Sequence, residues 1–154
     1  MSSLSRAVTA LVTTAVAFTL IPGAAADDVY HSEHMTLEPV GNAPLRTGFV
    51  ENIHANGPTI YAQEIYVLNG AGPSTDYEVH LIAYPFRPGC EGTPTDFGFA
   101  SLTTNRVGNG RAKRVFRPAD VPAELRNATH GIRWEIRTAG TTVYETQCTA
   151  VTLD

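Results

Sequence analysis

The chain has 154 residues, of which 43% are hydrophobic and 17% are charged, and its formal net charge is −4. This length suits one globular domain, and ordinary apolar content with low charge excludes a disordered tail, a collagen-like repeat and a coiled coil. The negative net charge argues against nucleic acid as a partner. The 2 Cys are too few for a disulfide-dense mini-protein or a four-Cys zinc site.

The first 26 residues have the layout of a secretory signal peptide. Arg6 precedes the uncharged stretch 7–21, Pro22-Gly23 interrupts it, and Ala24-Ala25-Ala26 supplies the small residues of a cleavage site. The alternative is a membrane anchor, which needs about 20 apolar residues and so a longer stretch than this one. We therefore expect residues 1–26 to be removed, leaving a secreted chain that begins at Asp27 and has no membrane span.

The clearest structural pattern lies near the C-terminus, where apolar and charged residues alternate over 131–138. Ile132, Trp134 and Ile136 fall on one face, as expected for a half-buried antiparallel strand with Trp134 as a core anchor. Ala139-Gly140 turns the chain, and 141–153 is rich in Thr and Val. The last 25 residues or so therefore predict one long hairpin.

The same alternation recurs upstream, cut by Gly, Pro and Asn clusters. It predicts strands over 33–38, 46–55, 59–68, 76–84, 97–104 and 111–116. A loop is expected over 85–95, a hairpin turn over 105–110, and a connection over 118–128 in which Asp120 caps a helical turn over 121–125. These elements predict an all-β, two-sheet antiparallel sandwich of seven or eight strands over 41–154. The segment 27–40 is expected to be an N-terminal arm or an edge strand.

One segment resembles a motif of known domains. Leu68 followed by Pro73, Thr75, Tyr77 and Val79 resembles the L…P-x-T-x-Y-x-V corner of fibronectin type III and related immunoglobulin-like domains, with a longer Leu–Pro spacing. The resemblance implies an immunoglobulin-like sandwich in which the Tyr77 hydroxyl bonds to backbone across a corner between the sheets. The alternative for Tyr77 is an ordinary core tyrosine.

A looser similarity concerns the layout of the whole domain. Tyr77-Glu78-Val79, the Cys90 loop, the stretch 96–110 and Arg133-Trp134 are similar in order to the actinomycete neocarzinostatin-type apoproteins. Those are secreted immunoglobulin-like sandwiches that hold an apolar chromophore in a cleft. The similarity implies a small apolar-ligand carrier, although the two short-range disulfides of that family are missing here. The alanine-rich cleavage region also resembles signal sequences of high-GC Gram-positive bacteria.

Cys90 and Cys148 stand alone in a chain that we expect to be exported, so a disulfide is the default. Closing a loop of this length stabilises the fold by about 4 kcal/mol in the chain-entropy model. The bond would pin the 85–95 loop to the terminal hairpin. The alternative, a reactive thiol or redox pair, has no C-x-x-C spacing to support it.

Metal binding and catalysis find little support. His31, Glu33 and His34 are weak metal-ligand candidates, but on a strand His31 and His34 point to opposite faces, so we expect no metal site and no cofactor. Hydrolase motifs are absent, although a Ser-His-Asp site could still assemble in space from one of Ser32, Ser74 and Ser101. We expect His80 to be an exposed strand residue beside Glu78.

Positive charge is concentrated in a dozen residues without an acid: Arg106, Arg111, Lys113, Arg114 and Arg117. Arg111 and Lys113 are expected to point one way along a hairpin edge and Arg114 the other. These charges either protect an edge strand from aggregation or form a contact surface for an anionic partner, whose binding would weaken with salt. The anionic partner could be an envelope polymer, an acidic protein or a lipid head group. Phe97 and Phe99 either belong to the core or form an exposed binding patch.

Together these patterns favour a monomeric, non-catalytic binding module. Its partner is expected to be extracellular or in the cell envelope, and its contacts to lie in the loops or along the basic edge. The apolar-ligand carrier, and a small secreted hydrolase or metal-binding protein, are the alternatives.

Overall fold

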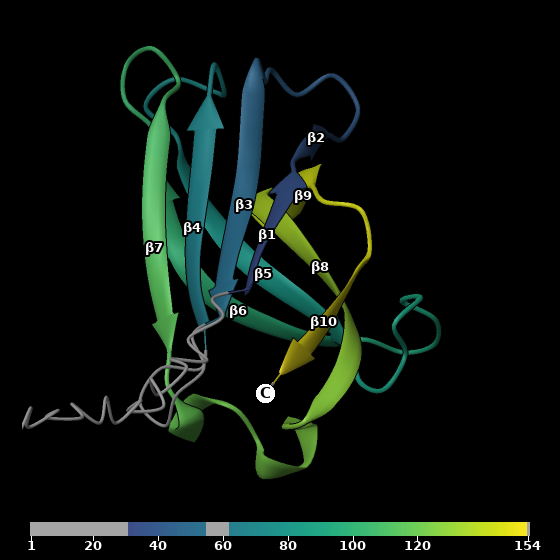
Figure 1. The fold of residues 1–154 in the computed structure, drawn as a ribbon. Coiled ribbons are helices and arrows are strands. Elements are labelled where there is room, and N and C mark those ends of the chain that lie inside the picture. Colours follow the sequence, from purple (N-terminus) through teal and green to yellow (C-terminus); the bar gives the residue numbers. More distant parts are fainter. Residues whose placement is uncertain (1–30, 55–61, 154) are drawn as a thin grey trace, which may run out of the picture.

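The computed structural model describes residues 31–54 and 62–153, so the expected signal peptide lies outside the described residues. Two antiparallel sheets pack face to face, which confirms the predicted all-β sandwich (Figure 1). Sheet A has the order β1-β3-β4-β7 and consists of β1 (His31–Thr36), β3 (Thr47–His54), β4 (Ala62–Asn69) and β7 (Gly110–Phe116). Sheet B has the order β2-β9-β8-β5-β6. Its strands are β2 (Glu38–Pro39), β9 (Thr141–Glu145), β8 (Ala128–Thr138), β5 (Asp76–Tyr84) and β6 (Thr95–Thr103). A further strand, β10 (Thr149–Leu153), pairs with β8 on the same side as β9 does.

The core lies between the sheets and centres on Trp134, which is fully buried, as predicted. Tyr66 and Leu68 of sheet A meet it from one side, and Val79 and Ile136 of sheet B complete its surroundings in the same cluster. Phe97 is half-buried and packs against this cluster, so it belongs to the core. The side chain of Phe99 is not among those described.

The terminal hairpin is confirmed, with a break that the sequence did not indicate. β9 pairs with the end of β8 and β10 with its start, and residues 146–148 separate them. The break is bridged because Thr146 donates its N–H to the Trp134 carbonyl (3.0 Å) and accepts the Trp134 N–H at its hydroxyl (3.1 Å). The N-terminal segment is similarly divided, since β1 is an edge strand of sheet A and β2 joins sheet B. These two divisions explain why the described chain has more strands than the seven or eight expected.

The predicted hairpin turn over 105–110 is wrong, because β6 and β7 belong to different sheets. The segment instead forms a corner that crosses between the sheets, and it is bonded to the other corner, 70–75, which joins β4 to β5. Ala71 donates its N–H to the Gly108 carbonyl (3.0 Å), and Ser74 donates its N–H to the Asn105 carbonyl (2.9 Å). Gly108 has a φ of 77°, and a Cβ there would lie 2.1 Å from the Ala71 oxygen, so the two corners meet only because this residue is glycine.

The connection between β7 and β8 also differs from expectation. It contains two short 3₁₀ turns, η1 (Pro118–Asp120) and η2 (Ala123–Leu125). Asp120 caps no helix over 121–125; its carboxylate accepts the Arg117 N–H instead (2.9 Å). Pro122 disfavours helical geometry at Val121, which is extended. No helix of the described residues is long and apolar enough to cross a membrane.

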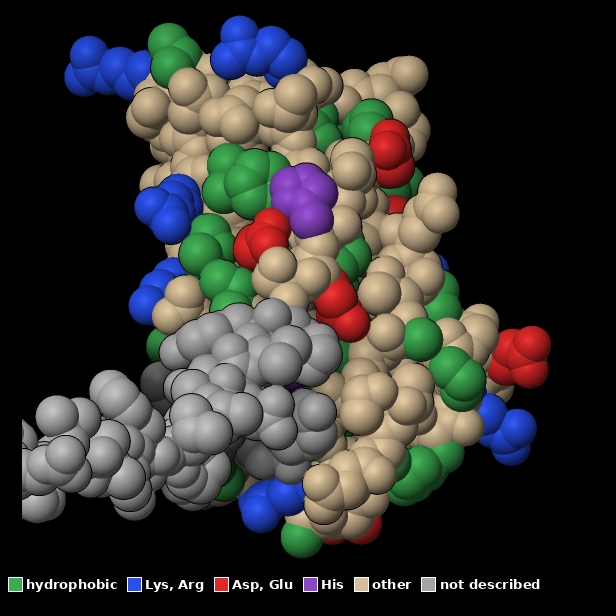
Figure 2. Space-filling model, viewed as in Figure 1, with side chains coloured by type: hydrophobic (Ala, Val, Ile, Leu, Met, Phe, Trp, Pro, Cys, Tyr) green, Lys and Arg blue, Asp and Glu red, His purple; other side chains and the backbone are tan. Residues whose placement is uncertain are grey.

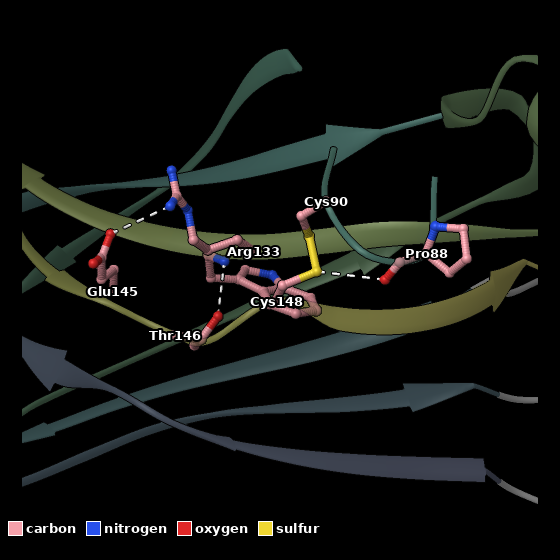
Figure 3. Close-up of a disulfide and its surroundings, with 7 residues drawn as sticks. Pro88, Cys90, Arg133, Glu145, Thr146 and Cys148 are labelled. Atoms are coloured by element: carbon pink, nitrogen blue, oxygen red, sulfur yellow. Dashed lines mark hydrogen bonds and ion pairs between the residues drawn. A yellow bond between two sulfur atoms is a disulfide. The ribbon is translucent and has the colours of Figure 1, made fainter. Parts of the chain in front are cut away.

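The disulfide between Cys90 and Cys148 is confirmed, and it joins the loop that follows β5 to the break between β9 and β10 (Figure 3). The two Cα atoms are 6.0 Å apart although the residues are 58 positions apart in the chain. The loop lies directly on Gly131 of β8, where a Cβ would come within 2.2 Å of the Arg87 oxygen and 2.9 Å of the Cys90 sulfur. The bond therefore holds the loop against sheet B, as expected.

The hydrogen bond implied by the corner resemblance is present. Tyr77 is buried, and its hydroxyl oxygen accepts the Gly72 N–H (3.1 Å) across the corner from β4 to β5. The same hydroxyl lies 3.5 Å from the hydroxyl of Tyr144, which donates to the Pro44 carbonyl (2.7 Å). A chain of hydrogen bonds thus ties the corner to β9 and to the segment that precedes β3.

Replacing Tyr77 by Phe should lower the free energy of unfolding by about 1–2 kcal/mol, because the partly buried Gly72 N–H loses its acceptor. Urea unfolding measures the change. Tyr84→Phe is the control, since Tyr84 is also buried on β5 but its hydroxyl bonds no described residue. Equal losses in the two variants would contradict a specific role for the corner bond.

Candidate functional site

The outer face of sheet A carries an unusual share of apolar side chains. Asn52 and His54 of β3 and Glu64 and Tyr66 of β4 are buried, so by alternation their neighbours along each strand point to the outside. We call the apolar members of this face the outer patch: Phe49, Ile53, Ile65, Val67 and Val115. All are half-buried except Val115, which is 37% exposed. A solvent-facing sheet face is usually polar, so the outer patch is a candidate contact surface.

Positive charge borders the outer patch on β7, the edge strand of sheet A. Arg111 pairs with Val67 and Lys113 with Ile65, and both are exposed on the outer face. Figure 2 shows hydrophobic side chains gathered over β3 and β4, with Lys and Arg side chains along the margin where β7 runs. We call the exposed cations of this region the basic edge: Arg106, Arg111, Lys113 and Arg117.

Arg114 is separated from this group, as expected from its position on the strand. It points to the inner side of β7, where its guanidinium carbon lies 5.1 Å from the centre of the Phe116 ring. The candidate surface for an anionic partner thus contains four of its five predicted residues. Arg111 and Lys113 lie on the edge strand β7 itself, whereas Arg106 lies in the corner before this strand and Arg117 directly follows it.

Of the weak metal candidates, Glu33 and His34 lie on opposite faces of β1, and the side chain of His31 is not among those described. His34 lies on the outer face, where it contacts the carboxylate of Glu51 (2.8 Å) and packs on the Phe49 ring (4.7 Å between centres). Glu33 lies on the opposite face, next to Asn52. Among the side chains that the structure describes, no group of three or more His, Cys, Asp or Glu could hold a metal ion.

A row of polar residues crosses the inner face of sheet A, and it was not predicted from the amino-acid pattern. The register pairs Glu33 with Asn52, Asn52 with Glu64, and Glu64 with Arg114, one residue from each strand. We call these four residues the inner polar row. Asn52 and Glu64 are each 2% exposed. An alternation pattern treats such residues as solvent-facing, so it placed none of them in the interior.

Glu64 is the central residue of the row and contacts both sheets. Its Oε2 accepts hydrogen bonds from the Tyr66 hydroxyl and from the indole Nε1 of Trp134 (2.8 Å). Burial raises the pKa of Glu64 to about 7, even though these two bonds and the nearby charge of Arg114 act in the opposite direction. Burial and the adjacent carboxylate likewise raise the pKa of Tyr66.

A cavity of about 70 Å³ lies beside Glu64, between the sheets at the end where η1 and η2 are located. Its polar wall includes Asn52 and His54, and its other walls are mostly apolar: Leu81, Ala83, Phe97, Phe116, Val121, Leu125, Ile132, Val151 and Leu153. Pockets for drug-sized ligands enclose about 300–1,000 Å³. The described cavity therefore gives no support to a carrier of a large apolar chromophore.

The outer face of sheet B is occupied by an ion-pair network. Glu135 accepts hydrogen bonds from Arg133 (2.7 Å) and Arg137 (2.6 Å), and Arg137 also bonds Asp96 (2.7 Å). Although partial burial opposes the effect, hydrogen bonds from Arg137 and its charge hold the pKa of Glu135 below its usual value. The pKa of Asp96 is also lowered, because bonds from His80 and Arg137 outweigh its burial. The charged side chains of this network bond one another, so we interpret the network as part of the structure of sheet B.

No catalytic triad is assembled on this face. His80 contacts Asp96 (2.8 Å), and Ser101 lines the same shallow depression of about 360 Å³, but among the described residues Ser101 bonds no histidine. His80 is half-buried and lies 3.6 Å from Glu78, so it is less exposed than expected. His130 is a buried structural residue: its Nδ1 accepts the Phe86 N–H (3.0 Å) and its Nε2 donates to the Leu125 carbonyl (2.7 Å).

Comparisons with protein-family models, with curated proteins and with solved structures find no match for this chain. Two features stand out: the outer patch with its basic edge, and the inner polar row with its cavity.

The raised pKa of Glu64 predicts a pH-dependent stability. Between pH 4.5, its ordinary pKa, and about 7, the folded protein keeps a proton that the unfolded chain releases. The free energy of unfolding should therefore fall as the pH rises through this window, by about 3 kcal/mol. Glu64→Gln, which stays neutral and can accept the same bonds, should remove this fall.

Urea unfolding at pH 5 and pH 8 tests the expectation. Glu124→Gln provides a matched change at an exposed position of η2 and should behave like the unmodified protein. The interpretation is wrong if Glu64→Gln loses as much stability between the two pH values as the unmodified chain does.

Proposed function

We propose that this chain is an exported, non-catalytic binding module that contacts an acidic protein partner through the outer patch and the basic edge. One observation carries the proposal: exposed Arg111 and Lys113 alternate with exposed Val115 on an edge strand, beside the apolar side chains of Phe49 and Val67. Positive charge attracts an acidic partner, and the adjoining apolar surface supplies contact area that is lost from water on binding.

The edge position of β7 favours a polypeptide as the partner. Its far side pairs with no other strand of the described residues, and such an edge can accept an added strand. An acidic extended segment could pair with β7 and place its side chains over the cations and Val115. An envelope polymer or a lipid head group would use the charges but leave the outer patch without a partner, so we favour a protein.

The absence of catalysis is part of the same proposal. The sequence carries no hydrolase motif, and His80 and Asp96 are engaged with Arg137 in a network that also holds Glu135. A histidine in contact with a carboxylate does not make a catalytic triad, because a triad also requires a nucleophile.

The finer fold type that we propose is immunoglobulin-like. The order β9-β8-β5-β6 matches a G-F-C-C′ sheet, and β3-β4-β7 then corresponds to strands A, B and E of the facing sheet. The hydrogen bond from the Gly72 N–H to Tyr77 adds nothing to this assignment, because Tyr77 lies on β5, which corresponds to strand C, whereas the tyrosine corner of such domains lies at the start of strand F. A relationship to neocarzinostatin-type proteins remains within this proposal as a matter of fold, without their carrier function.

Export is supported by the pattern of residues 1–26 and by the disulfide, since disulfides persist in oxidising compartments. When the full chain is expressed in a secreting bacterium, N-terminal sequencing of the protein from the medium should begin at Asp27. Replacing Ala24 and Ala26 together by Trp should block cleavage, whereas Ala25→Gln, between them, should not. Recovery of the full-length chain with its first residues intact from the cytoplasm would contradict export.

The binding proposal is tested with a synthetic peptide of alternating Glu and Val, measured by titration calorimetry at low and high salt. Arg111→Glu combined with Lys113→Glu should weaken binding about tenfold or more, because two attractive charges become repulsive. Added salt should weaken the binding of the unmodified protein. Arg87→Glu, an exposed charge in the disulfide loop, is the matched control and should leave the affinity unchanged.

Two further probes separate the partner classes. Polyglutamate of equal charge and vesicles that contain an anionic phospholipid should both bind more weakly than the alternating peptide. Equal or tighter binding of either probe, or no loss in the double variant, would overturn the proposal of an acidic protein partner.

A further inference from the structure

The polar wall of the inter-sheet cavity contains two residues whose hydrogen bonds are incomplete. Asn52 and His54, two positions apart on β3, are 2% and 3% exposed. The Asn52 Nδ2 donates to a carboxylate oxygen of Glu33 (3.2 Å) and lies 2.6 Å from the His54 Nε2. The amide must be oriented this way, because the opposite orientation would set its oxygen against the Glu33 carboxylate.

This orientation fixes the proton on the imidazole. Since the His54 Nε2 accepts from the Asn52 amide, the neutral ring carries its hydrogen on Nδ1. Among the described residues, neither the His54 Nδ1 nor the Asn52 Oδ1 has a hydrogen-bond partner, although both atoms are buried. The wall thus presents one free donor and one free acceptor, from two residues that both line the cavity.

Buried polar atoms without partners are rare, because each costs free energy that a partner would recover. Opposite them, the wall formed by Leu81, Phe97 and Ile132 is apolar. An apolar pocket with a few convergent polar groups is the usual form of a small-molecule site. The space of about 70 Å³ exceeds the roughly 10–15 Å³ that a cavity needs in order to hold one water.

We propose that this cavity binds a small neutral molecule with an apolar body of a few carbons and a head group that both donates and accepts a hydrogen bond, as a carboxamide or a hydroxyl does. The head accepts from the His54 Nδ1–H and donates to the Asn52 Oδ1, and the body packs against the apolar wall.

The surroundings favour a neutral ligand over a charged one. An anion would lie close to Glu33 and Glu64, which belong to the same polar row. A cation would leave its charge against an apolar wall, and Arg114 already supplies a positive charge beside Glu64. The raised pKa of Glu64 agrees with a site that disfavours charge.

The chain contains a built-in reporter for this site. Trp134 is the only tryptophan, and its indole Nε1 bonds the Oε2 of Glu64, a residue that lines the cavity. A ligand in the cavity should therefore shift the NMR resonance of the indole N–H, together with the imidazole resonances of His54.

Isobutyramide is a suitable probe, and isobutyrate is its matched control. The two molecules have the same shape, but the second is an anion at pH 7.5 and lacks the donor. The unmodified, oxidised protein is titrated with isobutyramide up to about 50 mM, which is the weakest dissociation constant expected of a ligand with six heavy atoms. The NMR resonances of Trp134 and His54 should shift with a saturable dependence on the isobutyramide concentration. The apparent affinity for isobutyrate, obtained from the same resonances, should be at least about tenfold lower than that for isobutyramide.

Asn52→Leu keeps the branched shape and the number of heavy atoms of the side chain but removes the free acceptor, and it should abolish the response to isobutyramide. Gln63→Leu is the matched control, since it changes an amide to Leu on the outer face of the same sheet, and it should bind as the unmodified protein does. If Asn52→Leu fails to fold, the comparison of the two probes on the unmodified chain still decides the question. Absence of shifts with isobutyramide, equal binding of isobutyrate, or unchanged binding in a folded Asn52→Leu variant would each overturn the proposal and leave a cavity that holds only water.

Discussion

The indole of Trp134 on sheet B donates a hydrogen bond across the core to Glu64 on sheet A, and the Tyr66 hydroxyl donates to the same carboxylate oxygen. This contact fixes which face of β4 is inside. With Glu64, Tyr66 and Leu68 directed inward, Ile65 and Val67 must point to the outside. The outer patch and the inner polar row therefore follow from one choice of strand orientation.

The strand orientation also explains why the sequence alone could not locate these sites. One face of β4 carries Ala62, Glu64, Tyr66 and Leu68, and the other carries Gln63, Ile65, Val67 and Asn69. Both faces mix apolar and polar residues, so alternation identifies a strand but does not say which side is buried. In β8, by contrast, Trp134 and Ile136 alternate with charged residues, and there the prediction was confirmed.

The sequence was informative where a local rule decides the structure and silent where distant segments do. The strand positions, the disulfide and the Tyr77 bond follow from alternation, from a pair of cysteines and from a short motif. The path of the chain after β6 depends instead on how Gly108 meets Ala71, a contact between two corners that no local pattern encodes. The helical turn expected over 121–125 is present only as the 3₁₀ turn η2, without a cap from Asp120, because Pro122 keeps the residue before it extended.

The two ends of the sandwich are held together by different means. At one end the corners 70–75 and 105–110 are joined by backbone hydrogen bonds, whereas at the other end side chains of both sheets line the cavity. Side-chain packing yields to thermal fluctuation more readily than paired backbone does. We therefore expect the packing around the cavity to loosen before the joined corners separate.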